Sequence, residues 1–208
     1  MFVQSQKFVE DRQGRIDGQL AIYGQESNYN TWKLCRMNLA IRGIDANLGQ
    51  QNADSFHNDQ HKSLKADYIM ANPPFNVDGV DKAKDAVKKD PRLMIDGKVN
   101  LPKNDNANYL WIQYFYNYLK PTGRAGFVMA SSASDAGHSE KDIREKLVKT
   151  GSVDVMMAIG NNFFYTRSLP CTLWFFDRAK ENDKKKRDKV LMLDARKIYR
   201  KVTSKVND

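Results

Sequence analysis

The apolar run Ala66–Ala71 is followed by Asn72 and then by two consecutive prolines. A residue before proline is driven out of the helical region, and proline has no N–H to donate to a neighbouring strand. The run therefore predicts a buried strand that ends in a stiff, extended turn at Asn72-Pro73-Pro74-Phe75. Open α/β sheets bind ligands beyond the carboxyl ends of their strands. Because the turn combines an amide, backbone carbonyls and an aromatic ring, we expect it to be the functional site.

Strand-like and helix-like segments alternate along the 208 residues, which predicts an α/β fold with a mostly parallel sheet. Helices are expected at 1–10, 28–41, 108–119 and 139–148, and strands at 20–26, around 48, and at 66–71, 124–130, 153–159, 169–176 and 190–193. The last two strands are joined by a polar turn without a helix, so the last strand should be antiparallel. One domain is expected for this length.

Residues 77–108 form a long polar stretch that favours a functional or mobile loop. Its basic residues could contact phosphates or could simply be solvated; they are Lys82, Lys84, Lys88, Lys89, Arg92, Lys98 and Lys103. The cluster at 184–187 fits a hairpin turn or a DNA contact, and the tail at 195–208 is basic. The net charge of +9 is compatible with a nucleic-acid partner and equally with a basic surface.

Cysteine, histidine and hydropathy patterns exclude several classes of protein. Cys35 and Cys171 lack the spacing of a disulfide framework or a zinc site and are expected to be small buried residues. His57 and His61 have no well-placed third ligand, so a loop is expected there, without a metal. No leader opens the chain and no apolar run reaches the roughly 18 residues that span a bilayer. A cytoplasmic protein without membrane contact is therefore expected.

The Asn-Pro-Pro-Phe turn suits the transfer of a group to an exocyclic amine. The lone pair of adenine N6 is delocalised into the ring, and two acceptors aimed at its N–H bonds would localise that pair. The Asn72 side-chain oxygen and the Pro73 carbonyl are candidates for these acceptors. Phe75 would supply a flat face for a base that has left the duplex stack. The alternative is a proline-rich turn whose Phe75 packs into the core.

Several segments, taken in order, resemble one family. They are 23–26, 31–40, 71–76, 106–109 with Trp111, 123–128, 143–148, 162–165 with Pro170, and 193–196. Together they resemble the N6-adenine DNA methyltransferases, specifically the modification subunit of type I restriction enzymes. The resemblance implies a Rossmann-like, S-adenosylmethionine-dependent fold with a mostly parallel seven-stranded sheet. It also implies DNA as the substrate and the specificity and restriction subunits of a type I complex as partners.

The resemblance also implies roles for individual residues. Glu26 would accept hydrogen bonds from the ribose hydroxyls of the cofactor, Asp54 would accept from its adenine amine, and Asn72 would also belong to the cofactor site. Phe164 matches the aromatic residue that packs on the flipped base. Phe163 and Tyr165 compete for that role, and core packing is the alternative for all three.

The chain departs from the family pattern at its start. The family has a glycine-rich loop, Asp-Pro-x-Cys-Gly-x-Gly-Gly, just before its first helix, and this sequence begins after the corresponding point. We therefore expect a truncated catalytic domain that lacks the first strand. One alternative is an inactive remnant that binds only DNA or partner subunits. Another is the same chemistry on glutamine amides or RNA adenines.

Overall fold

A computed structural model describes residues 1–14, 20–164 and 168–202, and the chain divides into two compact units, Met1–Ser63 and Leu64–Asp208. Each unit has its own apolar core. One domain was expected from the chain length. Length could not predict this division, because it does not show where contacts between segments are sparse. Among the described residues, none of the helices is long and apolar enough to cross a bilayer.

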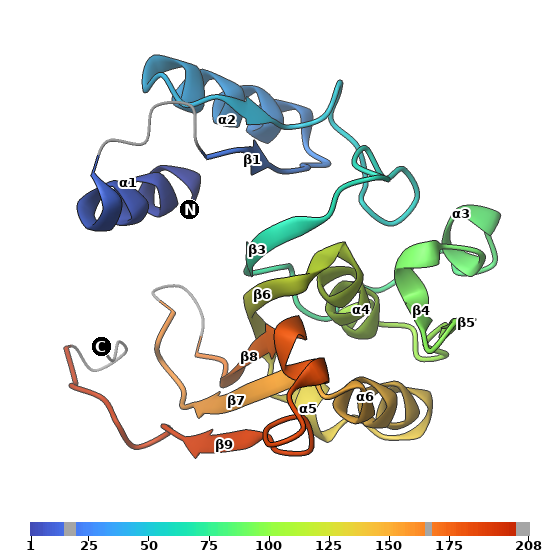
Figure 1. Ribbon diagram of the computed structural model, residues 1–208. Coiled ribbons are helices and arrows are strands. Elements are labelled where there is room, and N and C mark those ends of the chain that lie inside the picture. The colour runs from blue at the N-terminus through green and yellow to red at the C-terminus, as the bar shows by residue number, and fades with distance from the viewer. Residues whose placement is uncertain (15–19, 165–167, 203–208) are drawn as a thin grey trace. The chain divides into compact units, whose positions relative to one another are not determined.

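The first unit packs two helices with a short parallel β-sheet (Figure 1). Its elements are α1 (Phe2–Gln13), β1 (Ile22–Tyr23), α2 (Tyr29–Ile41) and β2 (Ala46–Asn47). The Asn28 side chain caps α2 by accepting from the Thr31 N–H at 3.0 Å. Trp32 is buried in the core of the unit, and its indole N–H donates to the Leu48 carbonyl at 3.0 Å.

The second unit is built on a five-stranded sheet in the order β3-β6-β8-β7-β9. Its elements are β3 (Ala66–Ala71), α3 (Asp85–Lys88), η1 (Pro91–Leu93), β4 (Met94–Ile95), β5 (Lys98–Val99), α4 (Asn108–Tyr118), β6 (Leu119–Ala130), α5 (Ser132–Asp135), α6 (His138–Thr150), β7 (Val153–Ile159), β8 (Cys171–Asp177), η2 (Arg178–Asn182) and β9 (Leu191–Asp194). The mixed α/β architecture with a mainly parallel sheet is confirmed.

One strand runs against the other four, but it is not the last one. β3 pairs parallel to β6, and β7 pairs parallel to β9, whereas β8 is antiparallel to both of its neighbours, β6 and β7. The expectation of an antiparallel last strand was wrong in this detail. The polar connection after β8 does reverse the chain, but it carries β9 past β7 to the far edge of the sheet (Figure 1). The cluster at 184–187 is therefore not a hairpin turn.

β3 was expected to be buried, and the structure corrects this. Tyr68 is 77% exposed and Met70 is 62% exposed. Within the described residues β3 is the edge strand of its sheet and pairs on one side only, with β6. A continuous apolar run shows that a strand is suited to burial, but it cannot show how many neighbours the strand has.

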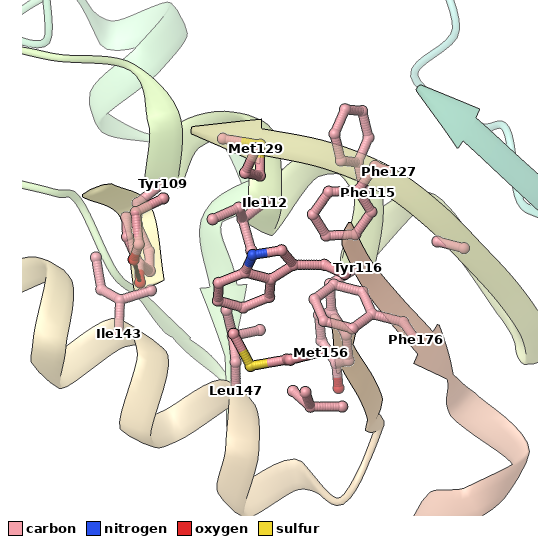
Figure 2. Packing of buried hydrophobic residues seen from close by; sticks show 14 of the residues in the cluster. Tyr109, Ile112, Phe115, Tyr116, Phe127, Met129, Ile143, Leu147, Met156 and Phe176 are labelled. Carbon is pink, nitrogen blue, oxygen red and sulfur yellow. Dashed lines mark hydrogen bonds between the residues drawn. The ribbon is translucent and has the colours of Figure 1, made fainter. Parts of the chain in front are cut away.

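Aromatic side chains from α4, β6 and β8 fill the core of the second unit. Figure 2 shows Phe115, Phe127 and Phe176 lying against one another, and the Phe127 ring centroid is 4.9 Å from that of Phe115 and 5.1 Å from that of Phe176. α6 adds Ile143 and Leu147 to the same cluster. This packing holds α4 rigidly against the sheet.

The segment between β3 and α4 is more ordered than its polar composition indicates. It contains α3, η1 and the antiparallel pair β4–β5. Val87, Leu93 and Ile95 are buried, so the segment has apolar anchors of its own. Isolated apolar residues among many charges give no periodic signal, which is why the sequence predicted only a loop.

Candidate functional site

The Asn-Pro-Pro-Phe turn lies directly after β3, at the carboxyl end of that strand. Pro73 is buried, Phe75 is half-buried, and Asn72 and Pro74 are exposed. In the described part of the chain the Asn72 side chain has no hydrogen-bond partner. Its amide is therefore free to bind a substrate or a ligand.

A pair of asparagines connects this turn to α4. The Asn76 N–H donates to Asn108 Oδ1 at 3.0 Å, and Asn108 Nδ2 donates back to Asn76 Oδ1 at 2.7 Å. Nearby, the Ala107 N–H donates to the Val77 carbonyl at 2.8 Å. No role for Asn108 was predicted from the sequence. The only signal was its place in one of the segments that resemble the family.

Phe164 is distant from the turn in sequence but lies close to it in the structure. It follows β7, and its ring centroid lies 6.3 Å from that of Phe75 in an edge-to-face arrangement. Phe163 instead contacts Tyr199, with ring centroids 6.4 Å apart. Tyr165, the third candidate, lies outside the described residues. Of the two described candidates, the one that faces Phe75 is Phe164.

Glu26 and Asp54 both lie in the first unit, beyond the carboxyl ends of β1 and β2. The Glu26 carbonyl accepts from the Ala53 N–H at 2.9 Å, which joins the two loops. Glu26 Oε1 accepts from the Asn28 N–H at 2.8 Å, and Asp54 Oδ1 accepts from the Phe56 N–H at 2.9 Å. Both side chains are half-buried, so their free lone pairs remain accessible.

The Gln25 side chain links the loop that carries Glu26 to the loop that carries Asp54. Its side-chain amide donates to the carbonyls of Ala53 at 3.0 Å and Asn58 at 2.9 Å, and its side-chain oxygen accepts from the Gln60 N–H at 3.0 Å. A hollow of about 420 Å³ also lies along β1 and β2 and is lined in part by Arg36 and Asp45. Glu26 and Asp54 are not among its lining residues.

His57 and His61 both bond to other groups of the protein. His57 Nδ1 pairs with Asp54 Oδ2, and His61 Nε2 bonds with the Gly24 carbonyl at 2.8 Å. His61 also packs edge-to-face against Tyr23, with ring centroids 5.6 Å apart. Across the residues that the structure describes, no cluster of three candidate ligands could hold a metal ion.

The basic residues of 77–108 divide into two that are bonded within the segment, the half-buried Lys82 and the buried Arg92, and a larger exposed group. Lys82 donates to the carbonyls of Asn104, Asp105 and Asn106, and the Arg92 guanidinium pairs with Asp90 in the interior. Lys84 and Lys89 are exposed and pair with acidic neighbours on the same segment. Lys88, Lys98 and Lys103 are also exposed. Lys82 and Arg92 are therefore structural and do not offer their charges to a phosphate.

The N-6 DNA methylase family matches residues 1–208, the whole chain. Two relatives are each 39% identical to it: the HindI methylase subunit of a type I restriction enzyme from Haemophilus influenzae, over 200 residues, and the MjaIX methylase subunit from Methanocaldococcus jannaschii, over 198 residues. Each alignment covers 95% of this chain but only 42% and 35% of the respective relative. The chain thus spans less than half the length of these relatives.

Solved structures agree with this assignment. The methyltransferase subunit of a type I restriction-modification system from Streptococcus thermophilus is 27% identical, with a TM-score of 0.75 over 89% of this chain and 38% of its own. The EcoKI M protein, 19% identical with a TM-score of 0.71 over 98% of this chain and 43% of its own, shares the fold. The chain belongs to the N-6 DNA methylase family.

Proposed function

We propose that this chain is part of the catalytic domain of an adenine-N6 DNA methyltransferase, the modification subunit of a type I restriction-modification system. The observation that carries the proposal is the exposed, unbonded Asn72 amide at the carboxyl end of β3, among the described residues, beside the Phe75–Phe164 ring pair. The family description, N-6 DNA methylase, supports this reaction and substrate, and the names of the two relatives, both methylase subunits of type I restriction enzymes, support the proposed kind of system.

The turn would prepare the amine for attack. Asn72 Oδ1 and the Pro73 carbonyl accept the two N–H bonds of adenine N6, which localises the nitrogen lone pair. The prolines fix the backbone, so the acceptors need little reorganisation as charge develops on the nitrogen. Phe75 and Phe164 offer apolar faces to a base taken out of the duplex stack. After transfer, the extra proton on N6 leaves to water.

The first unit fits a cofactor that carries a diol and an aromatic amine, such as S-adenosylmethionine, which when bound supplies an electrophilic methyl group. Glu26 Oε2 makes no hydrogen bond with the residues that the structure describes and would accept from the ribose hydroxyls. Asp54 would accept from the adenine amine, and Asn72 is proposed separately as a further cofactor-binding residue. The sequence contains no Asp-Pro-x-Cys-Gly-x-Gly-Gly segment, so no residue of this chain is assigned to the methionine part.

DNA is the proposed substrate, and the specificity and restriction subunits of a type I complex are the proposed partners. The exposed lysines Lys88, Lys98 and Lys103 provide charge for phosphate contacts, which position a duplex without reading its sequence. Target recognition would then belong to the specificity subunit.

The test is methyl transfer to DNA by the complete protein that carries this chain, assembled with its specificity subunit. Asn72→Ala should lower kcat by about 10²–10³-fold, the usual effect of removing one group that stabilises developing charge. Asp78→Asn, at an exposed position beyond the turn, is the matched control and should keep parental activity. Parental activity in Asn72→Ala would refute the site.

The substrate class is tested with the parental complex. Methyl transfer to duplex DNA, but not to RNA or to a glutamine-containing peptide, is expected. Transfer to none of the three would contradict the proposed activity of the complete protein. Calorimetry of the 208-residue chain with S-adenosylmethionine would then show whether these residues bind the cofactor without the glycine-rich loop.

A further inference from the structure

We propose that Asn108 is a positioning residue that locks the Asn72-Pro73-Pro74-Phe75 turn into its reactive shape by clamping Asn76. This inference rests on the proposed function, because it assumes that the turn binds the target base. Asn108 itself need not contact the base, since it acts through Asn76.

The turn requires an external support. Pro73 and Pro74 have no N–H groups, so the turn cannot be held by backbone hydrogen bonds from these two positions. Asn76 then has a φ of +51°, in the left-handed region that non-glycine residues rarely adopt. Such a conformation persists when the surrounding structure holds it, and the nearest constraint is the pair of hydrogen bonds to Asn108.

The clamp needs a polar side chain at position 108 that accepts from the Asn76 N–H and also bonds to the Asn76 side-chain amide. The Asn76 N–H can only donate, so it fixes Asn108 Oδ1 as the facing atom. Asn108 Nδ2 must then point at Asn76 Oδ1, where the distance is 2.7 Å. Aspartate at position 108 would keep the first bond, and the Asn76 amide could rotate to donate Nδ2 to its second oxygen, whereas leucine, of similar size, would lose both bonds. At position 76, aspartate keeps both the backbone donor and an acceptor, and it tolerates the left-handed conformation.

α4 makes Asn108 a rigid anchor. Asn108 is 3% exposed, and its own N–H donates to Asn106 Oδ1 at 3.1 Å. The next residue, Tyr109, is fully buried and donates its hydroxyl to the Ala133 carbonyl at 2.7 Å, and Arg144 donates to the same hydroxyl at 2.9 Å. The turn is thereby tied to the aromatic core, and a site supported by a packed helix is held more precisely than one on a free loop.

The experiment uses the complete protein with its specificity subunit and measures two independent quantities. Hydrogen exchange of the Asn76 amide reports the clamp without any need for activity. Steady-state methyl transfer reports its consequence. Asn108→Ala should expose the Asn76 amide to exchange and lower kcat by about 10–10²-fold, the effect of a misplacement of about 1 Å, with the KM for DNA within about twofold.

The matched variants separate positioning from general stability. Asn108→Leu should also lower kcat, because leucine is close in size but makes neither bond, whereas Asn76→Asp should lose less activity than Asn76→Ala. Asn182→Ala, an exposed asparagine outside the site, should change neither measurement. If Asn108→Ala leaves the exchange of the Asn76 amide unchanged, or exposes it without lowering kcat, the positioning role is wrong. Failure of the proposed function is recognised separately, by parental activity in Asn72→Ala.

Discussion

Asp90 and Arg92 show how a single pair of residues organises the segment between β3 and α4. The guanidinium bonds both carboxylate oxygens, with Arg92 Nε 3.0 Å from Oδ1 and Nη2 2.7 Å from Oδ2. It also lies over the Tyr114 ring at 3.9 Å and donates to the Tyr118 hydroxyl at 2.9 Å. Because both charges are buried, each is stable there only while its partner is present.

Asp90→Asn should therefore lower the free energy of unfolding by about 3–5 kcal/mol, because it leaves the Arg92 charge buried and uncompensated. The control is Asp85→Asn, which breaks an exposed pair with Lys89 on the same segment and should cost at most about 0.5 kcal/mol. Denaturant unfolding measures both. Equal losses for the two variants would contradict this account of the segment.

At the residue scale, the sequence predicted the turn and gave Phe75 and Phe164 as candidate residues, but it did not predict the hydrogen bonds between Asn76 and Asn108. Phe75 and Phe164 were named as candidates, and the structure places their rings together. Asn108 was missed because its contact with Asn76 spans 32 residues, a distance at which local patterns carry no information. For the same reason, nothing in the sequence distinguished the structural Lys82 and Arg92 from the exposed lysines.

At the element scale, periodicity predicted most helices and strands well. The helix at 28–41 and the strand at 66–71 correspond closely to α2 and β3. The pairing partners could not be read in the same way. A strand's composition gives its tendency to be buried, whereas the order β3-β6-β8-β7-β9 depends on how the connections cross the sheet.

Phe164 lies in the connection after β7, and residues that follow β9 pack against this connection. An added Cβ at Gly160 would lie 2.7 Å from the Arg196 carbonyl, and Phe163 packs on Tyr199. Gly160→Ala should therefore displace Phe164 and lower kcat for methyl transfer about tenfold or more, because a misplaced group near the reacting atoms is costly. Gly137→Ala, where an added Cβ meets nothing within 4 Å, is the control. Unchanged kcat in Gly160→Ala would show that this packing is not needed for methyl transfer.

At the scale of the whole molecule, the two compact units have separate cores. The first core is built around Trp32 and Leu39, and the second around residues that include Leu147 and Trp174. The proposed cofactor residues Glu26 and Asp54 belong to the first unit, and the proposed base-binding residues Asn72, Phe75 and Phe164 to the second. The stability of these two sets of residues thus depends on different cores.

Leu39→Ala and Leu147→Ala test this independence, and each is the control for the other. Both side chains are almost fully buried, so each substitution should cost about 2–5 kcal/mol in its own unit. Hydrogen exchange read separately for residues 1–63 and 64–208 should show lost protection only in the unit that carries the substitution, because a cavity weakens the core in which it forms. Equal losses in both units from either variant would instead mean that the chain unfolds as one cooperative body, so that cofactor-binding and base-binding residues are stabilised together.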